Sequence, residues 1–239
     1  GSREPLNFLE GQDNQPMEDG DEWLDWLVSL RDRLLDLLRD RSLSLKDRLR
    51  NFLLITGEAQ QLLDSENMAE LAAFCTESWV ISTKTDAGSG SWEAAACRCL
   101  QDLEILEPDW LALLKQWAQA PELPGFAPQD PEKLERIAVY FAFRYLLKAV
   151  NDGDLLGRAQ FCAVGGGGTG RPPRVGGVGG GPRAVLVTDR LSRFVGLPEA
   201  LRLFSREIEH NEENLGTLLE QFWQTEGLSL SALLAAFGG

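Results

Sequence analysis

PEKLERIAVYFAFRYLLKAV, residues 131–150, carries apolar side chains almost all the way round a helix of about 3.6 residues per turn. A helix that is apolar on nearly every side belongs in the interior of a protein. We therefore expect this stretch to form a central, buried helix. Its apolar positions are Ile137, Val139, Tyr140, Phe141, Phe143, Tyr145, Leu146, Leu147 and Val150.

A single positive charge, Arg144, lies inside this apolar run. A buried guanidinium group costs several kcal/mol unless an acid pairs with it. The predicted partners are Asp152, Asp154, Glu207 and Glu209. The alternative is that the long Arg144 side chain extends its head to water.

The segments before this stretch also have helical periodicity. EWLDWLVSLRDRLLDLLRD (22–40) places Trp and Leu on one face and charges on the other, which predicts an amphipathic helix. Ser44, with Asp47 three residues later, is typical of a helix N-cap. Further helices are expected over 66–78, 92–106 and 108–120.

The chain divides at a proline-rich connector, which covers 121–131. Such a segment separates periodic stretches and marks a candidate boundary. We expect a disordered acidic segment over 1–21, one helical subdomain over 22–120, and a second over 132–239.

Glycine dominates residues 165–182 and excludes regular structure there. Gly165, Gly167 and Gly170 have the G-x-G-x-x-G spacing, but no clear strand precedes them and they do not open a helix, so a flexible insert is favoured over a nucleotide loop. RAVLVTD (183–189) fits either a short strand or a resumed helix, and 80–91 either a loop or a short strand. The expected fold is mostly α, a multi-helix orthogonal bundle with room for one short strand or hairpin.

Composition restricts the class of protein. The 239 residues are 44% hydrophobic and 25% charged, which are values of globular proteins, and the formal net charge is −14. That charge argues against nucleic acid and anionic membranes as partners and favours a basic protein surface. No apolar run approaches the roughly 18 residues of a membrane span. Four cysteines in a chain of this length indicate the reducing cytoplasm.

LFSREIEHNEEN (203–214) contains the only histidine, His210. If it forms one helix, Leu203, Glu207, His210 and Asn214 share a face. Such a face suits binding or proton transfer. The alternative is a solvated acidic surface.

Two stretches, YFAFRYLLKAVNDGDLLGR (140–158) and LFSREIEHNEENLGTLLEQF (203–222), resemble the C-terminal half of the flagellin lysine-N-methylase family. RDRSLSLKDRLRNFLLI (39–55) resembles a middle part of the same pattern. The resemblance implies methyl transfer from S-adenosylmethionine to lysine side chains of flagellin or another lysine-rich protein surface.

The resemblance also implies a set of site residues. Lysine methylation needs a neutral amine, so an acid or histidine close to the ammonium group can take up its proton. The alternative is an ion-pair lattice that joins two helices. The implied catalytic residues are Glu207, Glu209 and His210, and the implied substrate- or cofactor-binding residues are Arg144, Asp152, Asp154, Arg206 and Asn214.

Members of that family carry a cysteine-rich cluster attributed to iron and sulfur. The cysteines of this sequence, at positions 75, 97, 99 and 162, are scattered, and the spacing of Cys97 and Cys99 is too tight for a zinc pair. An iron–sulfur cluster is therefore not supported in this chain, and no metal site is predicted. Two interpretations stay open: a protein that resembles a flagellin lysine-N-methylase, either active or in a truncated or inactive form, and a non-enzymatic acidic helical protein-interaction module.

Overall fold

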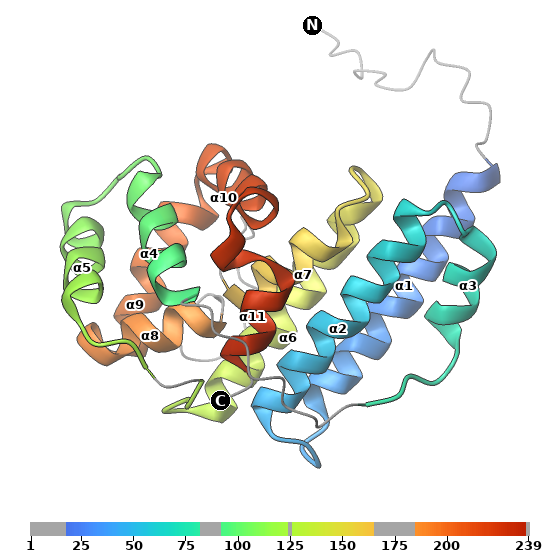
Figure 1. The fold of residues 1–239 in the computed structure, drawn as a ribbon, viewed down its shortest axis with the longest axis horizontal. Helices are drawn as coiled ribbons and strands as arrows, with labels where there is room; N and C mark the ends of the chain where they lie inside the picture. Colours follow the sequence, from blue (N-terminus) through green and yellow to red (C-terminus); the bar gives the residue numbers. More distant parts are fainter. Residues whose placement is uncertain (1–17, 82–91, 124–125, 165–184, 238–239) are drawn as a thin grey trace, which may run out of the picture.

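The computed structural model describes residues 18–81, 92–123, 126–164 and 185–237. Over these residues the chain forms α-helices joined by short turns, with no strand, which confirms the predicted mostly-α fold (Figure 1). In chain order the elements are α1 (Glu18–Arg39), α2 (Leu45–Asp64), α3 (Met68–Thr76), α4 (Trp92–Asp102), α5 (Pro108–Gln119), α6 (Pro131–Tyr145), η1 (Leu146–Val150), α7 (Leu155–Val164), α8 (Val185–Val195), α9 (Leu197–Phe204), η2 (Ser205–Glu209), α10 (Glu212–Gln224), η3 (Glu226–Leu228) and α11 (Leu230–Ala236).

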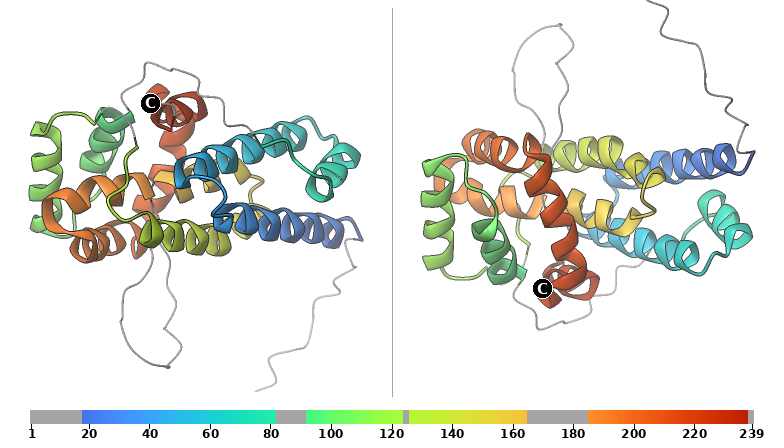
Figure 2. Two further views of the ribbon diagram at one scale, coloured as in Figure 1. Left: turned by 90° about the horizontal axis from the view of Figure 1, so that it is seen from below. Right: turned by 90° about the horizontal axis from the view of Figure 1, so that it is seen from above.

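The helices form an elongated molecule. At one end α1 and α2 lie side by side with α3 packed against both, and at the other end α4 and α5 lie with α8 and α9 (Figures 1 and 2). The middle of the molecule is formed by α6, α7, α10 and α11 (Figure 1). No described helix combines the length and the apolar character needed to cross a membrane.

Helix α6 is central, as the sequence predicts. It packs against α1, α7 and α8, and Phe141 and Tyr145 are fully buried. The α-helix ends at Tyr145 and continues as the 3₁₀ helix η1. Burial is not complete on every side, because the side chain of Phe143 is 57% exposed. The Arg31 guanidinium of α1 lies 5.1 Å from the Phe143 ring centroid and covers part of it.

The packing crosses the predicted boundary at 121–131. Helices from before and after this connector are neighbours: α1 packs on α6, α2 on α7, and α5 on α8. The hydrophobic core is one continuous cluster drawn from 22–120 and 132–239 alike. The two expected subdomains therefore share one core.

Some helix ends predicted from the sequence agree with the structure and others do not. The Ser44 hydroxyl accepts a hydrogen bond from the Asp47 amide at 3.1 Å, which confirms the predicted N-cap. Helix α4 ends at Asp102, four residues before the expected end at 106. The segment 183–189 resumes a helix, since α8 begins at Val185, so the strand alternative is wrong there.

Some expectations concern residues that the structure does not describe. Helix α1 begins at Glu18, inside the segment expected to be disordered over 1–21, and residues 1–17 lie outside the described part. The glycine-rich insert, 165–182, and most of the 80–91 loop also lie outside it.

A buried ion pair joins the start of α2 to α6. Glu135 Oε2 lies 2.8 Å from Arg48 Nη1, and Arg41 Nη2 lies 3.0 Å from Glu135 Oε1. Burial opposes ionisation of Glu135, but the hydrogen bonds and charges of Arg41 and Arg48 outweigh it and hold the pKa of Glu135 below its usual value.

We expect Glu135→Gln to lower the free energy of unfolding by about 3 kcal/mol at neutral pH, because the buried Arg48 loses its counter-charge. The native pKa is lowered, so this stabilisation is present above the unfolded-state pKa of about 4.3 and is lost as pH falls towards the native value. Urea unfolding of the wild type and of Glu135→Gln, at neutral and at acidic pH, measures how much stability the variant loses at each pH. Glu132→Gln, at the exposed 3.8 Å contact with Arg41, is the control and should change little. An equal loss at both pH values would contradict this account.

Candidate functional site

Glu207, the first of the implied catalytic residues, lies in the interior on η2. Its side chain is 0% exposed. Oε2 accepts the Leu106 amide at 2.8 Å and Oε1 accepts the Glu107 amide at 2.6 Å. Burial raises the pKa of Glu207, while these two amides oppose the rise. Both carboxylate oxygens thus hold the turn that precedes α5.

Asn214 fastens the same turn from α10. Its Oδ1 accepts the Glu104 amide at 2.9 Å, and its Nδ2 donates to the carbonyls of Glu104 and Glu207, each at 2.8 Å. The side chain is buried, and three hydrogen bonds engage it. Glu207 and Asn214 do lie together, as the sequence predicts, but the groups that they bind belong to the main chain.

The stretch 203–214 is not one helix. Helix α9 ends at Phe204, η2 is a turn of π-helix, and Asn211 begins α10 by accepting the amides of Glu213 and Asn214 at 3.1 Å each. The break turns His210 outward, where it is exposed. The expected shared face of Leu203, Glu207, His210 and Asn214 is therefore wrong at His210.

Arg206 and Glu209 are the remaining residues of the second motif. Arg206 is exposed and pairs with Glu107 at 2.8 Å. The side chain of Glu209 lies outside the described part of the structure.

The first motif forms the turn that enters α7. Asp152 pairs with Arg158 and accepts the Asp154 amide at 3.1 Å. Asp154 Oδ1 accepts the Gly157 amide at 2.9 Å and the Trp223 indole N–H at 3.2 Å. Burial raises the pKa of Asp154. A Cβ on Gly157 would lie 2.2 Å from Asp154 Oδ2, so a side chain there would displace the Asp154 carboxylate from this turn.

Arg144 is half-buried, and its Nε lies 3.4 Å from the hydroxyl of Tyr145. Three of its predicted partners, Asp152, Asp154 and Glu207, bind the donors named above.

The two motifs meet opposite ends of α10. Asp154 contacts Trp223 near the end of the helix, whereas Asn214 lies in its first turn. Nine residues of α-helix span about 13 Å. The acids of the first motif and the Glu207–Asn214 pair are thus separated along this helix.

The four cysteines are buried and dispersed. Burial raises the pKa of the Cys75 and Cys97 thiols to about 11 and raises that of Cys162 further. Such thiols are protonated near neutral pH and are poor metal ligands. Within the described ranges, no three His, Cys, Asp or Glu residues gather in a way that could hold a metal ion. The residues present therefore do not fit an iron–sulfur cluster.

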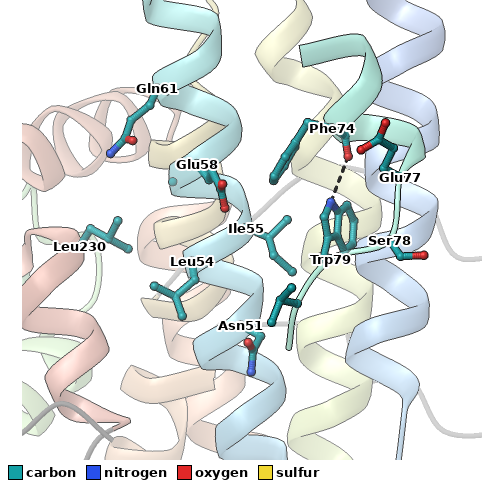
Figure 3. A pocket seen from close by; sticks show the side chains of 12 residues that line it. Asn51, Leu54, Ile55, Glu58, Gln61, Phe74, Glu77, Ser78, Trp79 and Leu230 are labelled. Carbon is teal, nitrogen blue, oxygen red and sulfur yellow. Dashed lines mark hydrogen bonds between the residues drawn. The ribbon is translucent and has the colours of Figure 1, made fainter. Parts of the chain in front are cut away.

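A groove of about 600 Å³ runs along α2, between Leu230 of α11 on one side and the end of α3 on the other (Figure 3). We call residues 77–80, which follow α3 and form one side of the groove, the wall segment. Of the eight residues implied by the family resemblance, the seven whose side chains the structure describes do not line this groove. The lining residues are Asn51, Leu54, Ile55, Gly57, Glu58, Gln61, Phe74, Glu77, Ser78, Trp79, Val80 and Leu230.

The groove combines apolar surface with negative charge. Leu54 and Ile55 of α2 form part of its floor, and Val80 in the wall segment is 93% exposed. Glu58 on α2 and Glu77 in the wall segment are exposed acids that line it (Figure 3). Among the described residues that line the groove none is Lys or Arg. An apolar surface between acids is complementary to a segment that carries both apolar and basic side chains.

Sequence reasoning did not find this groove. Glu58 lies on the helix that the Ser44 N-cap predicted, and Val80 falls in a stretch interpreted as a loop or a short strand. One signal was present: Trp79, Val80 and Ile81 are large apolar residues at the end of a short helix, where turns are usually polar.

Comparisons with known proteins add no relative. No family model, curated protein or solved structure matches this chain.

Proposed function

We propose that this chain is an acidic, helical protein-interaction module, and that its groove along α2 binds a lysine-bearing amphipathic segment of another protein. The observation that carries the proposal is the groove itself, in which the exposed Val80 and the half-buried Leu54 share one lining with the exposed acids Glu58 and Glu77. The partner is a basic protein surface, the class that the net charge of −14 attracts.

Lysine suits this groove on physical grounds. Its aliphatic stem packs on apolar surface while its ammonium group reaches a carboxylate. Apolar side chains of the same segment would cover Val80 and Leu54, which removes apolar area from water. The negative charge of the chain accelerates its encounter with a basic segment. The groove determines where on the chain that segment binds.

Fluorescence anisotropy with a labelled amphipathic peptide of about 18 leucine and lysine residues tests this proposal. We expect saturable binding that weakens as salt rises. The double substitution Glu58→Gln and Glu77→Gln should raise the Kd about fivefold, since two exposed ion pairs contribute about 1 kcal/mol together.

The matched control removes the same charge elsewhere. Asp102 and Asp109 are exposed acids at the α4–α5 end of the molecule, far from α2 and α3 (Figure 1). Asp102→Asn with Asp109→Asn should leave the Kd almost unchanged. If both double variants weaken binding equally, the peptide follows net charge rather than the groove. A peptide with glutamate in place of lysine should not bind.

Lysine methylation with S-adenosylmethionine is a second candidate, supported by the resemblance over 140–158 and 203–222. The groove favours it in one respect, because its two acids suit a substrate lysine of flagellin or another lysine-rich protein. S-adenosylmethionine would supply the methyl group. Calorimetric titration of S-adenosylmethionine into the full chain tests it: a micromolar Kd, about −8 kcal/mol, would support methyl transfer, and no detectable heat would exclude it.

A further inference from the structure

Arg33 of α1 does not line the groove, yet it holds the wall segment from behind. Its Nη1 donates to the Cys75 carbonyl at 2.7 Å and to the Phe74 carbonyl at 3.4 Å. Its Nη2 donates to the carbonyl of Glu77, the first residue of the wall segment. Its guanidinium carbon lies 3.9 Å from the ring centroid of Trp79, which places a cation over the indole face.

These contacts supply hydrogen-bond donors to carbonyl groups at the C-terminus of α3. The last four carbonyls of a helix have no partner within the helix. In α3, the Ala73 carbonyl accepts the Glu77 amide at 2.9 Å, and the Phe74 carbonyl accepts the Trp79 indole N–H at 3.0 Å (Figure 3). Arg33 satisfies the Cys75 carbonyl and thus contributes to the cap from another helix.

From this arrangement we infer that Arg33 is the positioning residue of the groove: it fixes the wall segment so that Glu77 and Val80 face a bound lysine-bearing segment. That Arg33 fixes the wall segment does not depend on the proposed function. That the wall segment faces a bound lysine-bearing segment rests on it. Without the contacts of Arg33, the wall segment with its exposed Val80 would be free to move away from the groove. A planar group with several donors is needed here, because three carbonyls and a ring are bound at once.

The test compares Arg33→Met and Arg33→Lys with Arg31→Met. Arg31 is two residues away on α1 and carries the same charge, but it contacts Asp32 and the Phe143 ring instead of the wall segment. In the free protein, the NMR resonance of the Trp79 indole N–H, assigned with Trp79→Phe, reports whether its bond to the Phe74 carbonyl persists.

We expect the Trp79 indole hydrogen to exchange about tenfold faster in Arg33→Met and in Arg33→Lys, and unchanged in Arg31→Met. The Kd for the leucine–lysine peptide should rise about tenfold in the same two variants, as it would if only about a tenth of the molecules kept the wall in place. Unchanged indole exchange in Arg33→Met would overturn the inference, whatever the peptide does. Faster exchange with no binding of the peptide by the wild type would sustain the positioning of the wall and refute the proposed function.

Discussion

Glu207→Gln is expected to lower the free energy of unfolding by about 3 kcal/mol. The side chain has almost the same shape, but the glutamine amide presents a donor to one of the two main-chain amides, of Leu106 or Glu107, that the carboxylate accepts. One buried N–H group then loses its partner and a charge-assisted bond is lost as well. Urea unfolding of the purified wild type and variant measures the difference.

Glu213→Gln is the control, since Glu213 is an exposed acid in the first turn of α10. Its loss should not exceed about 0.5 kcal/mol. The outcome separates two interpretations of Glu207. If Glu207→Gln leaves stability unchanged but abolishes binding of S-adenosylmethionine, Glu207 acts on a ligand. A large loss of stability supports the structural account, in which Glu207 fastens the turn before α5.

Glu93→Gln is expected to cost more, about 4 kcal/mol. Glu93 on α4 lies 2.9 Å from Arg190 on α8, and both side chains are almost completely buried. The same carboxylate accepts the Trp117 indole N–H at 3.2 Å and the Leu123 amide at 3.1 Å. Removal of one partner from a buried pair leaves the other charge without compensation. Thermal and urea unfolding should both show the loss, in a single transition.

A second variant keeps this prediction testable if Glu93→Gln does not fold. Glu93→Leu combined with Arg190→Met removes both charges and keeps apolar volume at the site. We expect the double variant to be more stable than Glu93→Gln, because no buried charge remains. If the double variant proves as unstable as the single one, the hydrogen bonds to Trp117 and Leu123, rather than the charge pair, carry the stabilisation.

These two acids have a common function in the fold. Glu93 joins α4 to α8, and Glu207 joins the turn before α5 to η2. Each connects a segment from before the proline-rich connector to one from after it. The division into 22–120 and 132–239 fails as a packing boundary partly for this reason: buried polar bonds as well as the apolar core cross it.

Helix periodicity and capping chemistry could be read from the sequence because both are local. The face of α1, the N-cap at Ser44 and the proline in the first turn of α5 depend on residues within a few positions of one another. The central position of residues 131–150 could also be predicted from the sequence, because a helix with so wide an apolar surface has to be covered by other elements.

The break at His210 was not predicted, although its cause is local in sequence. Asn211 accepts the Glu213 and Asn214 amides and begins a new helix, and this N-cap signal competes with continuation of the preceding helix. The competition is decided by Glu207 and Asn214, whose bonds to residues 104–107 hold the two helices at this junction.

The sequence by itself determined the helical class, several helix starts and the acidic character of the chain. Only the tertiary structure decided which polar side chains bind main-chain groups in the interior and which line a groove that a partner can reach. Glu207 and Asn214 resemble site residues in sequence, but main-chain groups about 100 residues away engage them. Glu58 and Glu77 carry no motif, yet the packing of α3 beside α2 places both at one groove. The physical reason is that a side chain's partners depend on distances between segments far apart in the chain, which periodicity and spacing do not encode.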